Sequence, residues 1–330
     1  MAVSMELITK LRNLTSAGLM DCKKALTETN GDIDAAVEIL RKKGKAVAAK
    51  RADRKASEGC VIAKKDGTYA AVLALCCETD FVAKNTGFVA LANQLIDLAV
   101  ANKIKSLDEL KAATIDGRTV EDLVVEEGGK TGEKTEIGYF ECLEAPATAA
   151  YTHHNSKLGT IVGFNMEIED TNIGHNVAMQ VASMNPVAVN RDSVDPAVVE
   201  SERKVAIEKT KEEQVKKAVE AALKKAGLNP NLLDSEDHIA SNIAKGWLTE
   251  EDAAKGRAIA SEAAEKKAAN LPEQMIANIA TGRVNKFFKE SCLMEQEYVM
   301  DGNLTIGQYL EQSQKGLVAV AFKRVNLNED

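Results

Sequence analysis

The sequence has few aromatic residues: Phe, Trp and Tyr make up 4% of its 330 residues, with a single Trp. Its cores must therefore be built from Ala, Val, Leu and Ile, and the segments rich in Ala, Lys and Glu favour helices. No apolar run approaches the roughly 20 residues that a membrane-spanning helix needs. The first residues hold no basic region followed by an apolar one, so we expect no signal peptide and a cytoplasmic protein without membrane contact.

Patterns that would indicate an enzyme are also missing. The six cysteines show neither a Cys-x-x-Cys spacing nor a paired framework, and in a cytosolic chain we expect free, mostly buried thiols. The sequence has no GxSxG motif, no HExxH motif and no glycine-rich nucleotide fingerprint. We therefore expect no catalytic residue, no cofactor and no small-molecule substrate.

Two short patterns suggest chemistry but do not meet its requirements. Residues 128–131 read Gly-Gly-Lys-Thr, yet a phosphate-binding loop needs a Gly where this chain has Val124. The pattern instead predicts a glycine-rich turn between strands. His153 and His154 have no third ligand at a useful spacing, and adjacent strand residues point to opposite faces. We therefore expect no metal site, and an exposed histidine pair at a strand end that is available for contact.

The charge is unevenly distributed along the chain. The net charge is -8 and the isoelectric point is near 5.3, so nucleic-acid binding would need a local basic patch. Residues 41–55 are one candidate, with eight basic residues and one acidic residue. This stretch is either a solvated linker helix or an RNA-binding arm. It has no aromatic residue for base stacking, which favours the linker, so no direct nucleic-acid contact is expected.

Residues 1–45 have the spacing of three short helices, which would form a small bundle. Asn30 and Gly31 are typical of a helix end and turn, and Asp32 is a good N-cap for the third helix. We expect that helix to end at Gly44. The apolar positions of the first helix are Leu7, Ile8, Leu11 and Leu14.

From Gly59 onwards the periodicity is that of strands. Residues 60–63 predict a short strand, and an Asp-Gly pair soon after it predicts a tight hairpin turn. Residues 69–77 are mostly apolar and predict a central strand that is covered on both faces. A polar break at residues 78–80 then leads into a helix.

A similar order recurs later in the chain. Three strands lead into a helix that ends at Asn185, directly before a proline. The chain closes with a helix at residues 305–312 and a strand at residues 317–325. We interpret the two regions as related strand-and-helix subdomains. The three strands are expected at residues 137–142, 148–153 and 159–168.

Residues 197–290 lie between the helix that ends at Asn185 and the closing helix at 305–312. They are rich in Ala, Lys and Glu and poor in β-branched residues. Pro230 and Gly246 divide this region, which we interpret as several helices in an antiparallel protrusion. The predicted fold class is therefore α+β. The expected domains are a helical domain with a basic linker at 1–55, a first subdomain at 56–140, and a second at 141–330 that carries the protrusion.

The loop at residues 79–82, Thr-Asp-Phe-Val, allows two interpretations. Thr79 and Asp80 are turn formers, and two apolar residues follow them directly. Residue type alone favours a Phe81 that packs on its own core and starts the next helix. The alternative is an exposed Asp-Phe pair that enters a partner, with a carboxylate to disturb a metal or phosphate site and a ring to wedge into a pocket.

A resemblance to a known family decides between them. Residues 7–44, including LRNLTSAGLMDCKKALTETNGD, closely resemble the N-terminal domain of the bacterial elongation factor Ts family, and residues 78–85 (ETDFVAKN) resemble its signature loop. Further matches follow in the right order at residues 151–153, 282–290 and 305–310. Together they span most of the chain.

The resemblance implies guanine-nucleotide exchange on elongation factor Tu: binding of its GDP-bound form, release of GDP and entry of GTP. It also implies an N-terminal bundle like a ubiquitin-associated domain, two α+β subdomains, and a coiled-coil-like helical protrusion. By position, Phe81 matches a ring that wedges into the partner's G domain near its magnesium side, and Asp80 a carboxylate that helps displace the ion. Thr79 and Val82 complete this magnesium-dislocating loop.

Other positions match partner contacts of the family. His153 matches a residue on the phosphate-loop side of the G domain. Val299 and Met300 match a more distal contact. The stretch 210–267 is longer than the usual family version, and we interpret it as an enlargement of the helical protrusion. The N-terminal positions that match contacts to the G domain are Arg12, Leu19, Met20 and Lys23.

Overall fold

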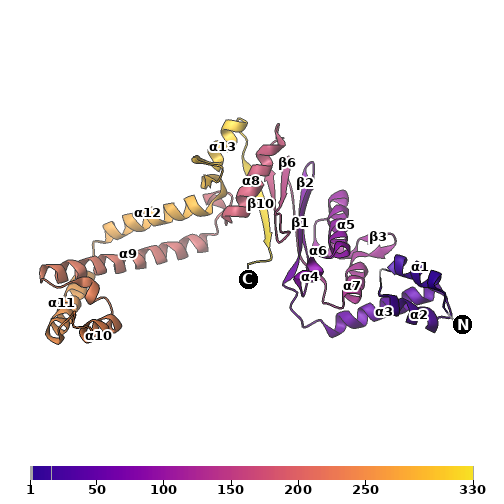
Figure 1. The fold of residues 1–330 in the computed structure, drawn as a ribbon. Coiled ribbons are helices and arrows are strands. Elements are labelled where there is room, and N and C mark those ends of the chain that lie inside the picture. The colour runs from indigo at the N-terminus through magenta and orange to yellow at the C-terminus, as the bar shows by residue number, and fades with distance from the viewer. Residues whose placement is uncertain (1–2, 16, 330) are drawn as a thin grey trace. The chain divides into compact units, whose positions relative to one another are not determined.

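The computed structural model describes residues 3–15 and 17–329. The chain forms a mixed α+β fold with two compact units: Met1–Val189 with Leu293–Asp330, and Asn190–Cys292 (Figure 1). Within the described ranges, we find no helix with the length and apolar character needed to cross a membrane.

Three helices open the first unit: α1 (Met5–Thr15), α2 (Leu19–Glu28) and α3 (Ile33–Lys50). Asp32 caps α3 by accepting a hydrogen bond from the backbone N–H of Ala35, as its position predicts. Of the four apolar positions with helical spacing in α1, Leu14 is 57% exposed and lies outside the core. The buried residues of the bundle are Ile8, Leu11, Ala17, Cys22, Ala25, Leu26 and Ala36.

Gly44 does not end α3, which continues to Lys50. The expected turn at residues 128–131 is also wrong, because these residues form the end of α7 (Val120–Thr131). Both errors have one cause. A Cβ on Gly129 would lie 2.6 Å from the Cα of Gly44, so these glycines let two helices cross at backbone distance. A glycine that permits close packing looks the same in sequence as one that breaks a helix.

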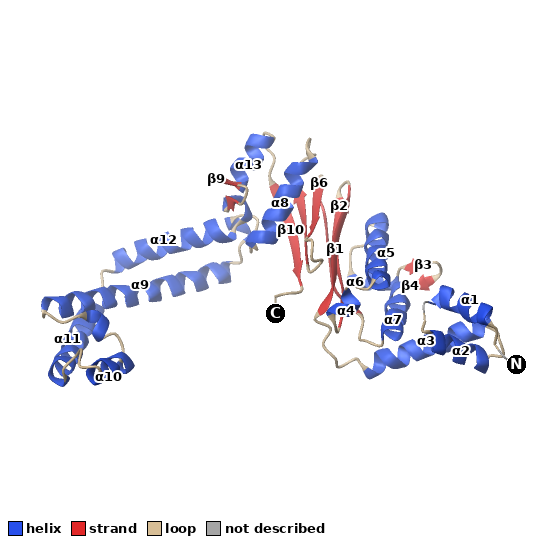
Figure 2. Cartoon of the chain, in the orientation of Figure 1, coloured by secondary structure: helices blue, strands red, loops and turns tan. Residues whose placement is uncertain are grey.

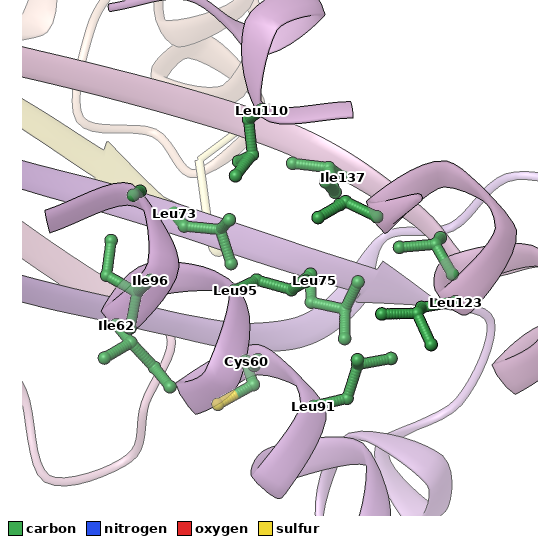
Figure 3. Packing of buried hydrophobic residues seen from close by; sticks show 14 of the residues in the cluster. Cys60, Ile62, Leu73, Leu75, Leu91, Leu95, Ile96, Leu110, Leu123 and Ile137 are labelled. Atoms are coloured by element: carbon green, nitrogen blue, oxygen red, sulfur yellow. The ribbon is translucent and has the colours of Figure 1, made fainter. Parts of the chain in front are cut away.

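The first sheet has the antiparallel order β1-β2-β5, with β1 (Glu58–Asp66), β2 (Tyr69–Cys77) and β5 (Glu136–Glu144). Every residue of β2 is buried, which confirms the prediction of a covered central strand. One face of the sheet packs on α5 (Thr86–Asn102), α6 (Leu107–Ala112) and α7, as Figure 3 shows for part of this core. Short strands β3 (Thr114–Ile115) and β4 (Arg118–Thr119) precede α7.

The second sheet has the order β10-β7-β6, with β6 (Ala147–Thr152), β7 (Leu158–Phe164) and β10 (Ala319–Asn326). It packs on α8 (Thr171–Met184) and α13 (Ile306–Ser313), and its other face meets the first sheet. The strand at 137–142 was expected in this region, but as β5 it pairs with β2. A domain boundary between residues 140 and 141 therefore falls inside β5, and the first sheet extends to Glu144.

The unit Asn190–Cys292 consists of helices (Figure 2). The long helix α9 (Pro196–Lys225) packs against both α11 (Glu250–Ala269) and α12 (Glu273–Ser291). Helix α10 (Glu236–Ala244) adds a small core around Ile239. This unit also contains η1 (Arg191–Ser193) and η2 (Pro230–Leu232), whereas η3 (Leu293–Glu295), β8 (Glu297–Tyr298) and β9 (Asp301–Thr305) belong to the first unit.

Candidate partner-binding site

The 79–82 loop leaves the end of β2 and forms most of a single helical turn, α4 (Asp80–Ala83). The side chain of Thr79 caps this turn by accepting from the backbone N–H of Val82. Val82 packs partly on the first core and Ala83 is buried. Phe81 points the other way and is 84% exposed.

The expectation from residue type alone, that Phe81 packs on its own core, is therefore wrong. The core position goes to Phe88 of α5, which is fully buried. The turn begins at its cap Thr79, which places Val82 and Ala83 on the side that faces the core. Phe81 comes before these two residues and lies on the solvent side. The loop presents a large apolar ring on a short, capped support.

Asp80 lies beside Phe81 and is partly exposed. Its Oδ2 accepts a hydrogen bond from Lys84 Nζ at 2.7 Å. This hydrogen bond is the main reason why the pKa of Asp80 is below its ordinary value, with a smaller contribution from the charge of Lys157. Asp80 is therefore an ionised carboxylate at neutral pH. Asp80 and Lys84 have the i,i+4 spacing of an ion pair on one helical face, so the sequence itself contains a signal for this contact.

His153 lies in the turn between β6 and β7. Its Nδ1 is 2.8 Å from the hydroxyl of Tyr151, and its ring centroid is 4.2 Å from that of His154. The two rings do not point to opposite faces as expected, because β6 ends at Thr152 and the histidines follow it. In the part of the chain that the structure describes, no three His, Cys, Asp or Glu side chains are grouped as metal ligands.

The turn that carries His153 lies at the same end of the sheets as the 79–82 loop. The backbone carbonyl of Ser156 in this turn accepts a hydrogen bond from the backbone N–H of Val61 in β1 at 2.7 Å. Lys157 forms an ion pair with Glu58 at 2.6 Å. Glu58 is opposite Cys77, the last residue of β2 before the loop. The structure therefore brings the histidine turn and the loop to neighbouring strand ends.

The N-terminal candidates lie in the three-helix bundle. Met20 is 70% exposed, and its neighbour Leu19 is also exposed. Arg12 near the end of α1 and Lys23 in α2 are exposed as well. Neighbouring exposed apolar side chains such as Leu19 and Met20 are typical of a protein-contact surface.

Val299 and Met300 form the tip of the β8–β9 hairpin, and Met300 is 66% exposed. The buried Gln180 of α8 holds this hairpin: its side chain accepts from the backbone N–H of Val299 at 2.9 Å and donates to the carbonyl of Glu297 at 3.0 Å. All the candidate contact residues belong to the unit Met1–Val189 with Leu293–Asp330.

The basic stretch 41–55 is largely used inside the chain. Arg41 and Lys45 pair with Asp122 of α7. Arg51 and Arg54 pair with Glu78, at 2.6 and 3.8 Å. These contacts favour the interpretation of the stretch as a linker helix over that of an RNA-binding arm.

The sequence was compared with known proteins. The family model described as "Elongation factor TS" matches residues 78–226 and 213–329. The protein named elongation factor Ts from Phocaeicola vulgatus is 56% identical to the chain over 331 residues, covering all of both chains. The proteins of that name from Parabacteroides distasonis and Porphyromonas gingivalis are 54% and 39% identical, again over the full length of both. The chain therefore belongs to the elongation factor Ts family.

Proposed function

We propose that this chain acts in the elongation stage of protein synthesis, in the cytoplasm, as the guanine-nucleotide exchange factor of elongation factor Tu. It binds the GDP-bound partner, opens the site that holds magnesium and phosphate, and promotes release of GDP so that GTP can bind. Membership in the elongation factor Ts family supports this role.

The single observation that carries the mechanism is the direction of Phe81. The ring is 84% exposed, although burying a Phe side chain stabilises a protein by about 1.5–3 kcal/mol. The neighbouring residues of the loop are anchored in the fold, so the exposed ring does not reflect a loose loop. A rigidly mounted apolar ring is suited to entering a pocket of a partner.

Exchange of this kind needs no covalent chemistry. A nucleotide bound at nanomolar affinity is held by about 12 kcal/mol, and magnesium that bridges its phosphates supplies part of that hold. An exchange factor that binds the nucleotide-free partner more tightly than the nucleotide-bound one lowers the partner's affinity for nucleotide by the same ratio. When nucleotide binds again, it lowers the affinity for the exchange factor, which then dissociates. Phe81 would separate the elements around the magnesium site, and the carboxylate of Asp80 would disturb the ion.

The other candidate positions, of which His153 is only partly exposed, would supply the remaining affinity and set the orientation. We assign contacts with the G domain to the N-terminal bundle and contacts near the phosphate loop to His153. The hairpin tip formed by Val299 and Met300 would make a more distal contact. The bundle residues with this role are Arg12, Leu19, Met20 and Lys23.

The test is release of a fluorescent GDP analogue from purified elongation factor Tu in stopped flow. Asp80→Ala combined with Phe81→Ala should lower the maximal stimulated rate by at least about a hundredfold, because it removes both the ring and the carboxylate. Each single substitution should give a smaller loss. Tyr139→Ala is the matched control, since Tyr139 is a half-exposed aromatic residue on β5, outside the loop.

The double variant should keep the circular dichroism spectrum and thermal transition of the parent chain, because neither side chain is in the core. Stimulated release at the parental rate in a folded double variant would refute the mechanism. A comparable loss in Tyr139→Ala would show that exposed aromatic residues in general, and not this loop, determine the rate.

A further inference from the structure

Two segments far apart in the sequence bind each other's backbone through glutamate side chains. Glu133 Oε2 accepts from the backbone N–H groups of Glu78 at 3.1 Å and Thr79 at 3.0 Å. Glu133 Oε1 accepts from the Thr79 hydroxyl at 2.7 Å. In return, Glu78 Oε1 accepts from the backbone N–H of Lys134 at 2.6 Å. The start of the 79–82 loop is thus joined to residues 133–134 by four hydrogen bonds.

The Glu78 side chain has a second set of partners. Arg51, directly after α3, lies 2.6 Å from Glu78 Oε1, and Arg54 lies 3.8 Å from Oε2. The N–H of Lys134 and the Arg51 guanidinium hold the pKa of the Glu78 carboxyl below its ordinary value. The carboxylate is therefore ionised at neutral pH, where charge-assisted hydrogen bonds are the stronger kind.

These contacts bear on Phe81 through the backbone. Because its ring is 84% exposed, packing on the core does little to fix its direction. That direction is set by the turn α4, which begins at its cap Thr79. Thr79 is held by Glu133 at both its backbone N–H and its hydroxyl. Moving Thr79 would therefore reorient the ring without changing any atom of Phe81 or Asp80.

The segment that holds the loop is itself fixed. Residues 133–134 follow the end of α7 after Gly132, which has a φ of 72° and caps the helix. Helix α7 crosses α3 at Gly129 and Gly44 and shares ion pairs with it through Asp122. The reference point for the loop is thus a helix packed against the N-terminal bundle.

We propose that Glu133 is a positioning residue for nucleotide exchange, which holds the backbone of residues 78–79 so that Phe81 and Asp80 meet the partner in the productive direction. The inference rests on the proposed function, because it needs the loop to be the element that opens the nucleotide site. Glu133 itself need not touch the partner. Its role is to keep the loop in the direction that is productive at the step that opens the nucleotide site, so its loss should affect the maximal rate more than the affinity.

Three substitutions separate this role from a general loss of structure. Glu133→Ala removes all three hydrogen bonds. Glu133→Asp keeps the charge but shortens the side chain by one methylene, which draws the carboxylate away from the loop. Glu133→Gln keeps the shape, since its amide oxygen can accept from the two N–H groups while its NH2 donates to the Thr79 hydroxyl. Glu136→Ala is the control: it removes a nearby glutamate whose ion pair is with Lys134 and not with the loop.

The measurement is the rate of release of a fluorescent GDP analogue from elongation factor Tu as a function of factor concentration. The Ala and Asp variants should lower the maximal rate between about tenfold and a hundredfold, the cost expected of a misplaced group. Their half-saturating concentration should change little, because the other contact residues remain. The Gln variant should restore most of the rate, and Glu136→Ala should match the parent chain. Parental rates in both the Ala and the Asp variants would overturn the proposal.

A double-mutant cycle with Phe81→Ala adds a readout that a purely structural role would not give. If Glu133 acts through the loop, Glu133→Asp should have little further effect once the ring is gone. Full additivity of the two losses would refute the positioning role. If Phe81→Ala itself leaves exchange at the parental rate, the proposed function fails. If Phe81→Ala is slow and the Glu133 variants are normal, only the present inference fails.

Amide hydrogen exchange tests the geometry without the partner. In the parent chain, the N–H groups of Glu78 and Thr79 should be protected by their bonds to Glu133. Glu133→Ala and Glu133→Asp should raise the exchange rates of these two amides, and β2 should keep its protection. Unchanged exchange at both amides in a folded Asp variant would contradict the proposed contact.

Discussion

At the residue scale, Phe81 and Phe88 show how two identical side chains in one short segment take opposite roles. Phe88 is fully buried under the first sheet, and Phe81 is almost fully exposed. The difference arises from the cap at Thr79, which fixes where the helical turn begins and so which positions face the core. An apolar residue held outside a completed core is available for a partner.

Residue type could not predict this difference. A Phe after a polar break is more often a core residue, and only the longer resemblance of residues 78–85 favoured exposure. Glu133 had no signal at all in the sequence, since it reaches the loop across 54 residues. Contacts of this kind depend on how the sheet and α7 pack, which local patterns do not contain.

Lys84 allows a prediction about the charge of the loop. Its hydrogen bond is the main cause of the low pKa of Asp80, so Lys84→Met should raise that pKa towards the ordinary value of 3.8. Lys157→Met should raise it by less, because Lys157 acts only through its charge at longer range. The shifts are measurable by NMR titration of the Asp80 carboxyl carbon in each variant.

The sign for stability follows from the direction of the shift. Since the pKa of Asp80 is lowered in the folded chain, the pair with Lys84 stabilises the loop above the ordinary pKa of Asp80. This contribution is lost as the pH falls through the lowered value. Lys84→Met should therefore remove one source of acid sensitivity at α4, and an unchanged pKa of Asp80 in that variant would contradict the assigned cause.

At the scale of elements, local sequence patterns correctly predicted the features that depend only on residues close together in the chain. The buried strand β2, the hairpin turn before it and the Asp32 cap all appear where the sequence indicates. The errors concern contacts between distant segments: β5 pairs with β2 across 60 residues or more, and the glycines of α3 and α7 meet at a helix crossing. A pattern of single residues does not reveal which strand or helix will be the neighbour.

The helix crossing predicts an unusual response to alanine. Within a helix, Gly→Ala normally stabilises by up to about 1 kcal/mol. At Gly129, however, a Cβ would lie 2.6 Å from the Cα of Gly44. Because this is a backbone atom, no side-chain rotation can relieve the clash. Overpacking of this kind costs about 1–3 kcal/mol. Gly129→Ala should therefore lower the free energy of unfolding by about 1–2 kcal/mol in urea titrations, after the gain in helix propensity is deducted.

Gly282 in α12 is the matched control, because a Cβ there meets no atom within 4 Å. Gly282→Ala should stabilise its helix by up to about 1 kcal/mol. A Gly129→Ala variant as stable as the parent chain would show that α3 and α7 can separate without loss. In that case the crossing would not be the fixed reference point for the loop.

At the scale of the whole molecule, the helical unit Asn190–Cys292 is an insertion in the first unit. The chain leaves that unit at Val189 and re-enters it at Leu293. These two ends are joined within the first unit: Leu293 donates its N–H to the carbonyl of Ala188 at 2.9 Å, and Met294 donates to Val189 at 3.0 Å. The gap left by removing the insertion is therefore short enough for a few residues to bridge.

A chain in which residues 190–292 are replaced by a short Gly-Ser linker should fold, because the cores of the first unit take their buried residues from Met1–Val189 and Leu293–Asp330. Every proposed contact residue is retained as well. We expect its maximal rate of GDP release to stay within about threefold of the parent, a difference below about 1 kcal/mol. Circular dichroism and stopped-flow release measure the two properties separately. A folded chain with a loss above a hundredfold would instead place an essential contact in the helical unit, and Phe81→Ala in the shortened chain would show whether the loop still acts without it.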